Sequence, residues 1–161
     1  YEPLTIPDDA LDLASPWGPL PGLDPAKLPG LVIDDRAAEK TGQWTAGTGL
    51  KGFVAYSYVY SSGEDAAIKF TFQAPSTGRF EVRLAYLNHE NRGKNIPVTL
   101  TAGGKSQTVK VNMTEPAPLE HNFISIGFVE MEKGQSGTVE MNGKGVQGHL
   151  HADAIQILPA P

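Results

Sequence analysis

Apolar and polar residues alternate along much of the chain after about residue 30. In the segment 66–74, Ile68, Phe70 and Phe72 fall on one face of an extended chain, and the segment 79–87 repeats this pattern. A period of two residues over this length is typical of a β-strand that is buried on one side. Both segments are therefore predicted to be strands, joined by the turn-forming residues Pro75–Gly78.

The same alternation continues toward the C-terminus. It predicts further strands at residues 98–101, 108–112, 123–130, 138–141 and 149–158. Short strands at a spacing of about 8–12 residues, separated by turn residues such as Ala102–Gly104, indicate a β-sandwich or a barrel. We predict an all-β fold, an antiparallel jelly-roll-like sandwich formed by residues 30–161.

Residues 1–29 form a separate, proline-rich segment. Proline fixes φ and lacks an amide donor, so this segment is predicted to be a linker or an extended arm. Apolar residues could attach the arm to the sandwich, namely Leu11, Leu13, Trp17, Leu20 and Leu23. Because the chain begins at Tyr1, we expect it to be one part of a larger protein.

Composition excludes several function classes. The net charge is −5 and the 13 basic residues are scattered, which argues against nucleic acid as a partner. No apolar run of about 18 residues predicts membrane insertion. The chain has no cysteine, and no glycine-rich phosphate loop lies between a strand and a helix, so we predict no disulfide and no cofactor.

A row of tyrosines is the first candidate site. Tyr56, Tyr58 and Tyr60 would share one face of a strand, and Trp44 precedes them in the chain. Exposed rings stack on the C–H faces of sugars, so these aromatics are predicted to bind a glycan. The alternative is that they pack inside the sandwich, with hydroxyls bonded at its edge.

A polar loop is the second candidate. Asn88, His89, Asn91 and Arg92 offer amide, imidazole and guanidinium groups that bind sugar hydroxyls or carboxylates. The loop follows the most regular predicted strand, which would hold it in place. Asparagine is also common in loops because it tolerates left-handed backbone conformations.

Two acidic or histidine-containing motifs could bind metal. His149, His151 and Asp153 share a strand parity that would suit a divalent ion or a metal-assisted hydrolase, although a backbone-bonded, buried Asp153 is favoured. Asp34 and Asp35 could bind calcium, but adjacent residues of a strand point to opposite faces, so capping or turn roles are favoured. We therefore predict no metal site and no catalytic residue.

A resemblance to a known family rests on seven motifs that occur in the family's order. They are Leu28–Asp35, Gly42–Trp44, Gly52–Tyr58, Gly78–Tyr86, His89–Arg92, Asn95–Val98 and Ala152–Ile157. With these motifs, the chain from Asp24 to Pro159 resembles the golvesin and xanthan-lyase carbohydrate-binding-like domain. That module occurs in large exported bacterial proteins, including planctomycete proteins described as FAD-dependent oxidoreductases. The chain departs from the family at Gly93 and Lys94, where small residues are more common.

The resemblance implies a jelly-roll-like sandwich in a secreted, periplasmic or cell-surface bacterial protein. It also implies a non-catalytic accessory domain that binds polysaccharide and contacts other domains of its parent. The alternative is a structural domain that docks onto a neighbouring domain or subunit through residues 1–29 and has no glycan ligand. In either case the resemblance suggests that Asp34, Asp35 and Asp153 tie the two ends of the domain together.

Overall fold

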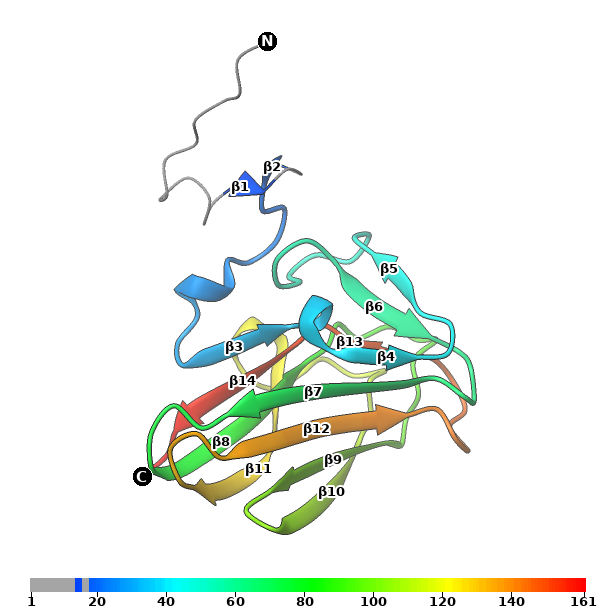
Figure 1. The fold of residues 1–161 in the computed structure, drawn as a ribbon. Helices are drawn as coiled ribbons and strands as arrows, with labels where there is room; N and C mark the ends of the chain where they lie inside the picture. Colours follow the sequence, from blue (N-terminus) through cyan, green and yellow to red (C-terminus); the bar gives the residue numbers. More distant parts are fainter. Residues whose placement is uncertain (1–13, 16–17) are drawn as a thin grey trace.

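The computed structural model describes residues 14–15 and 18–161 (Figure 1). The strands are β1 (Ala14–Ser15), β2 (Gly18–Pro19), β3 (Leu31–Asp34), β4 (Glu39–Thr41), β5 (Thr45–Gly47), β6 (Tyr58–Ser61), β7 (Ala67–Gln73), β8 (Gly78–Ala85), β9 (Ile96–Ala102), β10 (Lys105–Val111), β11 (Phe123–Met131), β12 (Ser136–Asn142), β13 (Leu150–Ala152) and β14 (Ala154–Pro159). Three 3-10 turns accompany them: η1 (Pro25–Lys27), η2 (Asp35–Ala37) and η3 (Glu120–Asn122). The described residues contain no helix with the length and apolarity of a membrane span.

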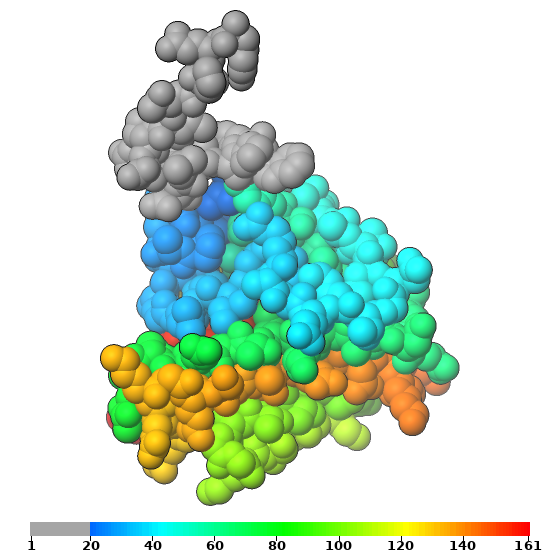
Figure 2. Space-filling model, viewed as in Figure 1, coloured from blue at the N-terminus to red at the C-terminus, as the bar shows by residue number. Residues whose placement is uncertain are grey.

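Two antiparallel sheets form a sandwich. One has the strand order β10-β9-β12-β7-β4 and the other has the order β11-β8-β14-β3. A third sheet, β13-β6-β5, lies at one end of the sandwich, and its cyan residues sit above β7 and β12 in the space-filling view (Figure 2). The predicted all-β, antiparallel sandwich fold is confirmed.

The alternation in the sequence explains why the sheets pack together. On β7, Ile68, Phe70 and Phe72 are at most 2% exposed, and they share a single core cluster with Val82 and Leu84 of the opposing sheet. The intervening side chains face the solvent. Burial of apolar area, worth about 25 cal/mol per Å², therefore drives the two sheets together.

The predicted C-terminal strand differs from the observed one. Residues 149–158 form two strands, because the chain leaves β13 of the third sheet and enters β14 of the sandwich at Asp153. The short strands β4 and β5 were not predicted, since each has only three residues and lacks a clear period.

The segment before β3 is attached to the sandwich from Leu20 onward. Leu23 pairs with Val54, donating its amide to the Phe53 carbonyl at 2.8 Å and accepting from the Ala55 amide at 2.7 Å. Leu20 packs against the second core cluster, so these two predicted anchors contact the domain. The other three, Leu11, Leu13 and Trp17, lie outside the described residues, and the domain boundary at residue 30 stays a prediction.

Two neighbouring positions on β7 test the core assignment. Phe70→Ala removes a side chain that is 1% exposed and should lower the free energy of unfolding by about 3–5 kcal/mol. Thr71→Ala, on the exposed face of the same strand, should change it by less than about 0.5 kcal/mol. Urea denaturation followed by tryptophan fluorescence measures both. Equal effects would show that β7 does not bury the predicted face.

Candidate functional site

The tyrosine row is shorter than predicted. Tyr58 and Tyr60 share a face of β6, but Tyr56 precedes the strand in a turn where Ala55 has a left-handed φ of 60°. The expected single face for all three rings is therefore wrong, because the turn reorients Tyr56. Its ring instead lies against the Arg36 guanidinium, whose carbon is 4.5 Å from the ring centroid.

Tyr58 is part of the interior. It is 4% exposed, its ring centroid lies 4.6 Å from that of His151 and 5.9 Å from that of Phe53, and its hydroxyl accepts a hydrogen bond from the Leu50 amide at 3.1 Å. A Cβ added to Gly47 of β5 would lie 2.7 Å from this ring. For Tyr58 the alternative is therefore confirmed: its ring packs in the interior and is not exposed to stack on a sugar.

Tyr60 is the member of the row that reaches the surface. It is half-buried, and its ring lies between two side chains of other segments. The Arg92 guanidinium carbon is 5.4 Å from the ring centroid, and the His149 ring meets it edge-on at 6.0 Å. A cation over an aromatic face is attracted by the ring quadrupole. The first and second predicted sites therefore meet at Tyr60 and Arg92.

The polar loop is held against this end of the domain by a short parallel bridge between Arg92 and His149. The Asn91 carbonyl accepts the His149 amide at 2.8 Å, and the His149 carbonyl accepts the Gly93 amide at 3.0 Å. Gly148, at φ 105°, permits this approach, since a Cβ there would lie 2.8 Å from the Arg92 backbone.

Within the loop the side chains differ in exposure. Asn88, His89 and Asn91 are exposed, and the His89 ring accepts the Asn91 amide at 3.2 Å. Arg92 is only 6% exposed. Its Nη1 donates to the Asn91 side-chain oxygen at 2.6 Å, and its Nε has no hydrogen-bond partner in the described part of the chain.

Arg92 is a buried cation without a carboxylate partner among the described residues. Burial lowers the pKa of its guanidinium, but arginine stays charged at neutral pH. Transfer of an unpaired charge from water into the protein is unfavourable. The Tyr60 ring offsets part of this cost, and an anionic group bound at the loop would offset more.

Two surface depressions flank the Tyr60–Arg92 pair. One, of about 430 Å³, is lined by Gln43, Thr45, Tyr60, Ser61, Ser62, Gly63, Asp65 and His149. The other, of about 440 Å³, is lined by Arg92, Lys94, Asn95, Gly145, Val146 and Gln147. Sequence reasoning missed most of these residues, because isolated polar residues on four separate segments have no common spacing.

Trp44 does not join this pair. It is half-buried, packs at the edge of the main core and donates its indole N–H to the Thr41 carbonyl at 2.9 Å. Its neighbours Gln43 and Thr45 line the first depression instead.

The proposed histidine–aspartate metal set is not assembled. His151 is fully buried, its Nδ1 accepts the Leu87 amide at 3.3 Å, and burial lowers its pKa to about 3. Asp153 turns away and accepts the Val54 amide at 2.8 Å, as its favoured backbone-bonded role predicted. His149 contacts the polar loop. The strand parity failed here because Asp153 lies between two strands of different sheets.

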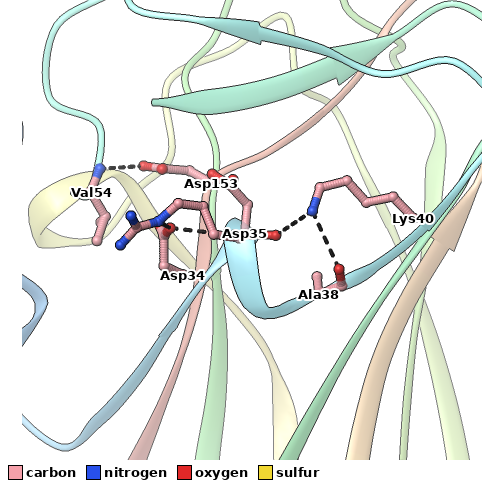
Figure 3. A network of polar contacts seen from close by, with 7 residues as sticks. Asp34, Asp35, Ala38, Lys40, Val54 and Asp153 are labelled. Atoms are coloured by element: carbon pink, nitrogen blue, oxygen red, sulfur yellow. Dashed lines mark hydrogen bonds and ion pairs between the residues drawn. The ribbon is translucent and has the colours of Figure 1, made fainter. Parts of the chain in front are cut away.

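The acidic pair takes the favoured capping role, since the Asp34 carboxylate accepts the Arg36 amide at 3.3 Å at the start of η2, but its two side chains are placed differently from the prediction. Asp34 ends β3 and Asp35 begins η2, so the chain bends between them and both carboxylates approach Asp153 (Figure 3). The expectation of opposite faces is therefore wrong. The role in joining the ends of the domain is confirmed, because β3 pairs with β14 and the Asp35 amide donates to the Asp153 carbonyl at 2.9 Å.

Solved structures with the same fold include carbohydrate-active proteins. A Paenibacillus xanthan lyase aligns with a TM-score of 0.73 at 22% identity, over 81% of this chain and 13% of the lyase. A Podospora anserina GH26-CBM35 β-(1,4)-mannanase aligns with a TM-score of 0.59 at 19% identity, over 81% of this chain and 28% of the enzyme. A family 35 carbohydrate-binding module from Clostridium thermocellum aligns with a TM-score of 0.57 at 15% identity, over 81% of this chain and 98% of the module.

The chain thus spans a small part of the two enzymes and nearly all of the isolated module. None of the curated proteins compared with it is a significant match. The profile of the golvesin C-terminal domain matches residues 31–159, which include both main sheets and the Tyr60–Arg92 pair. By this match and by its fold, the chain belongs to the golvesin C-terminal domain family.

Proposed function

We propose that this chain is a non-catalytic accessory domain that binds polysaccharide for a larger exported bacterial protein. Proteins of the same fold include a xanthan lyase and a family 35 carbohydrate-binding module, which supports this class of function. The proposed glycan site is the end of the sandwich where Tyr60 and Arg92 lie between the two depressions.

The observation that carries the proposal is the buried Arg92 guanidinium over the Tyr60 ring, 5.4 Å from its centroid. A guanidinium pairs with a carboxylate through two parallel hydrogen bonds, and an aromatic ring stacks on a sugar face. Lys94 lines the same depression as Arg92 and adds positive charge. Together these groups favour a sugar that carries a carboxylate, such as a uronic acid.

A catalytic role for this site has little support. Asp65 is the single carboxylate among the residues that line the two depressions. Glycoside hydrolysis generally requires a pair of opposed carboxyl groups. Each depression has a volume of only about 430–440 Å³, so the expected affinity of one domain for a glycan is weak, with Kd near the millimolar range.

The alternative is a structural domain that docks onto its neighbour. The attached part of the N-terminal segment, Leu20–Leu23, packs on its own sandwich and is not free to bind elsewhere. Docking would thus depend on residues that precede it. Solution scattering of the parent protein with and without residues 1–19 distinguishes docking from glycan binding.

Calorimetric titration with a uronic-acid oligosaccharide and its neutral counterpart tests the glycan site. The acidic ligand should bind more tightly, and Arg92→Gln should weaken its binding about tenfold or more while affecting the neutral ligand less. Tyr60→Ala should weaken both ligands, because it removes the stacking surface.

A second arginine–aromatic pair provides the matched control. Arg79 lies 4.7 Å from the ring centroid of Phe128, which is 45% exposed in a separate depression. Arg79→Gln and Phe128→Ala should leave binding unchanged. If only Arg79→Gln and Phe128→Ala lose binding, the glycan site lies at that pair and not at Tyr60 and Arg92. If wild type binds no glycan at millimolar concentration, the proposed function is refuted.

The buried His151, whose ring lies 4.6 Å from that of Tyr58, predicts an acid-sensitive contribution to stability. In the folded domain the pKa of His151 is about 3, below the ordinary 6.5. As the pH falls below 6.5, the unfolded chain therefore binds a proton at this histidine that the folded domain does not, which favours unfolding. The stability advantage of wild type over His151→Asn should therefore shrink by up to about 1.4 kcal/mol per pH unit below 6.5. Urea denaturation at pH 8, 6 and 5 measures it, and a constant difference would contradict the assignment.

A further inference from the structure

Three carboxylates meet where the first and last strands of the sandwich pair. Asp34, Asp35 and Asp153 each place one oxygen within 4.8 Å of the others (Figure 3). The side chains of Asp35 and Asp153 are deeply buried, as each residue is 1% exposed. Asp34 lies at the edge of the cluster, with a side chain that is 10% exposed. None of these residues belongs to the proposed glycan site.

Each carboxylate keeps one buried oxygen that has no hydrogen-bond partner among residues 14–15 and 18–161, namely Asp34 Oδ1, Asp35 Oδ2 and Asp153 Oδ1. The second oxygens of two of them are used, since Asp34 Oδ2 accepts the Arg36 Nε at 2.9 Å and Asp153 Oδ2 accepts the Val54 amide at 2.8 Å. A buried, unpartnered acceptor is unfavourable. Three such carboxylates, each with an oxygen within 4.8 Å of the other two, point to a positively charged group that all three share.

The ammonium of the nearby lysine binds backbone carbonyls and not the carboxylates. Lys40 Nζ donates to the carbonyl oxygens of Asp35 at 2.6 Å and Ala38 at 3.3 Å, and it forms no ion pair with a carboxylate of the cluster (Figure 3). Arg36 pairs only with Asp34. Among the described residues, the two deepest carboxylates, those of Asp35 and Asp153, thus form no ion pair. The positive charges of Lys40 and Arg36 lower the pKa of Asp35 only in part, because burial and Asp34 raise it more.

The electrostatics of the protein without a bound ion agree with this geometry. Burial, and then the neighbouring carboxylate, raise the pKa of Asp35 to about 8. Burial raises the pKa of Asp153 to about 9, with further contributions from Asp35 and Asp34. The negative charges are strongly disfavoured unless a cation is added, because a bound cation reverses these shifts.

We propose that Asp34, Asp35 and Asp153 bind one divalent cation, and that Ca²⁺ fits the cluster best. Ca²⁺ prefers oxygen ligands at about 2.3–2.6 Å, so two ligands on opposite sides of it lie up to about 5 Å apart. The three carboxylate oxygens are within that limit of one another. Water would complete the coordination from the exposed side of Asp34, and the added Arg36 charge would bring the cluster to neutrality.

The bound cation would connect three parts of the domain. Asp34 and Asp35 stand at the end of β3, and Asp153 directly precedes β14. Through its second oxygen, Asp153 also holds Val54, which lies on the segment that leads to β6. The cation therefore stabilises the junction of the sandwich with the third sheet. Cation binding and glycan binding involve different residues, and either can occur without the other.

Calorimetric titration of chelator-treated protein with CaCl₂ at pH 7.5 tests the site. We expect one Ca²⁺ per chain and a rise in melting temperature of about 5–10 °C at a hundredfold excess over Kd. Asp35→Asn and Asp153→Asn should each abolish the stoichiometric binding and the temperature shift. Asp24→Asn, which removes a carboxylate that caps η1 outside the cluster, should retain both.

The metal-free variants separate a cation site from a cluster of protonated acids. Without metal, Asp35→Asn should melt at or above the wild-type temperature, because it removes charge repulsion and keeps the side-chain shape. With Ca²⁺, it should melt below wild type. If wild type shows no binding of Ca²⁺, Mg²⁺ or Mn²⁺ at millimolar concentration, or if Asp35→Asn melts above wild type with and without Ca²⁺, the cation site is refuted.

Discussion

Asp153 lies where three parts of the fold meet, and its hydrogen bonds fix their relative positions. Its carbonyl accepts the Asp35 amide at 2.9 Å, its amide donates to the Ala85 carbonyl at 3.1 Å, and its carboxylate accepts the Val54 amide at 2.8 Å. These contacts join the end of β3, the end of β8 and the segment that leads to β6. The rest of the architecture depends on this junction, because β3, β8 and β14 of one main sheet meet there with the segment that leads to the third sheet.

The use of a carboxylate at this position has a physical cost. An amide or a hydroxyl could accept the Val54 hydrogen bond without bringing a charge into the interior, whereas a buried carboxylate must be neutralised. Two further aspartates beside it raise that cost. A set of three acidic residues is therefore poorly explained by hydrogen bonding to the backbone alone. It is explained by a shared cation, which turns mutual repulsion into a link between strands that are far apart in the sequence.

The sequence predicted the long strands well because their periodicity is local. The alternation of Phe70 and Phe72 with Thr71 reports directly on which side of β7 is buried. It could not show that Ala55 adopts a left-handed conformation and removes Tyr56 from the strand, because an alanine gives no signal for that turn. Nor could it bring Asp34 and Asp35 together with Asp153, since they meet only through the pairing of β3 with β14.

The candidate site was predicted in parts. Tyr60 was identified from the alternation of residues along a strand, and Arg92 from the polar side chains of its loop. Their contact depends on Gly148, which lets the segment with His149, just before β13, approach the loop. The same pairing explains why Arg92 is buried although loop arginines are usually exposed. A residue's chemistry can be read from the sequence, whereas its burial here is set by backbone contacts between residues more than fifty positions apart.

The net charge of −5 opposes an acidic glycan at long range, but the effect at the proposed site depends on how far each charge lies from it. At physiological ionic strength the Debye length is about 8 Å, so exposed charges on the far side of the domain are largely screened at the site. Arg92 is buried and screened much less, so a carboxylate at the loop interacts mainly with it. In the proposed binding mode, the overall charge would slow the approach of a polyanion, whereas Arg92 and Tyr60 would set the strength of the contact locally. A site of the proposed kind would select its ligand by a single charged group, and linking several such sites would raise the overall affinity.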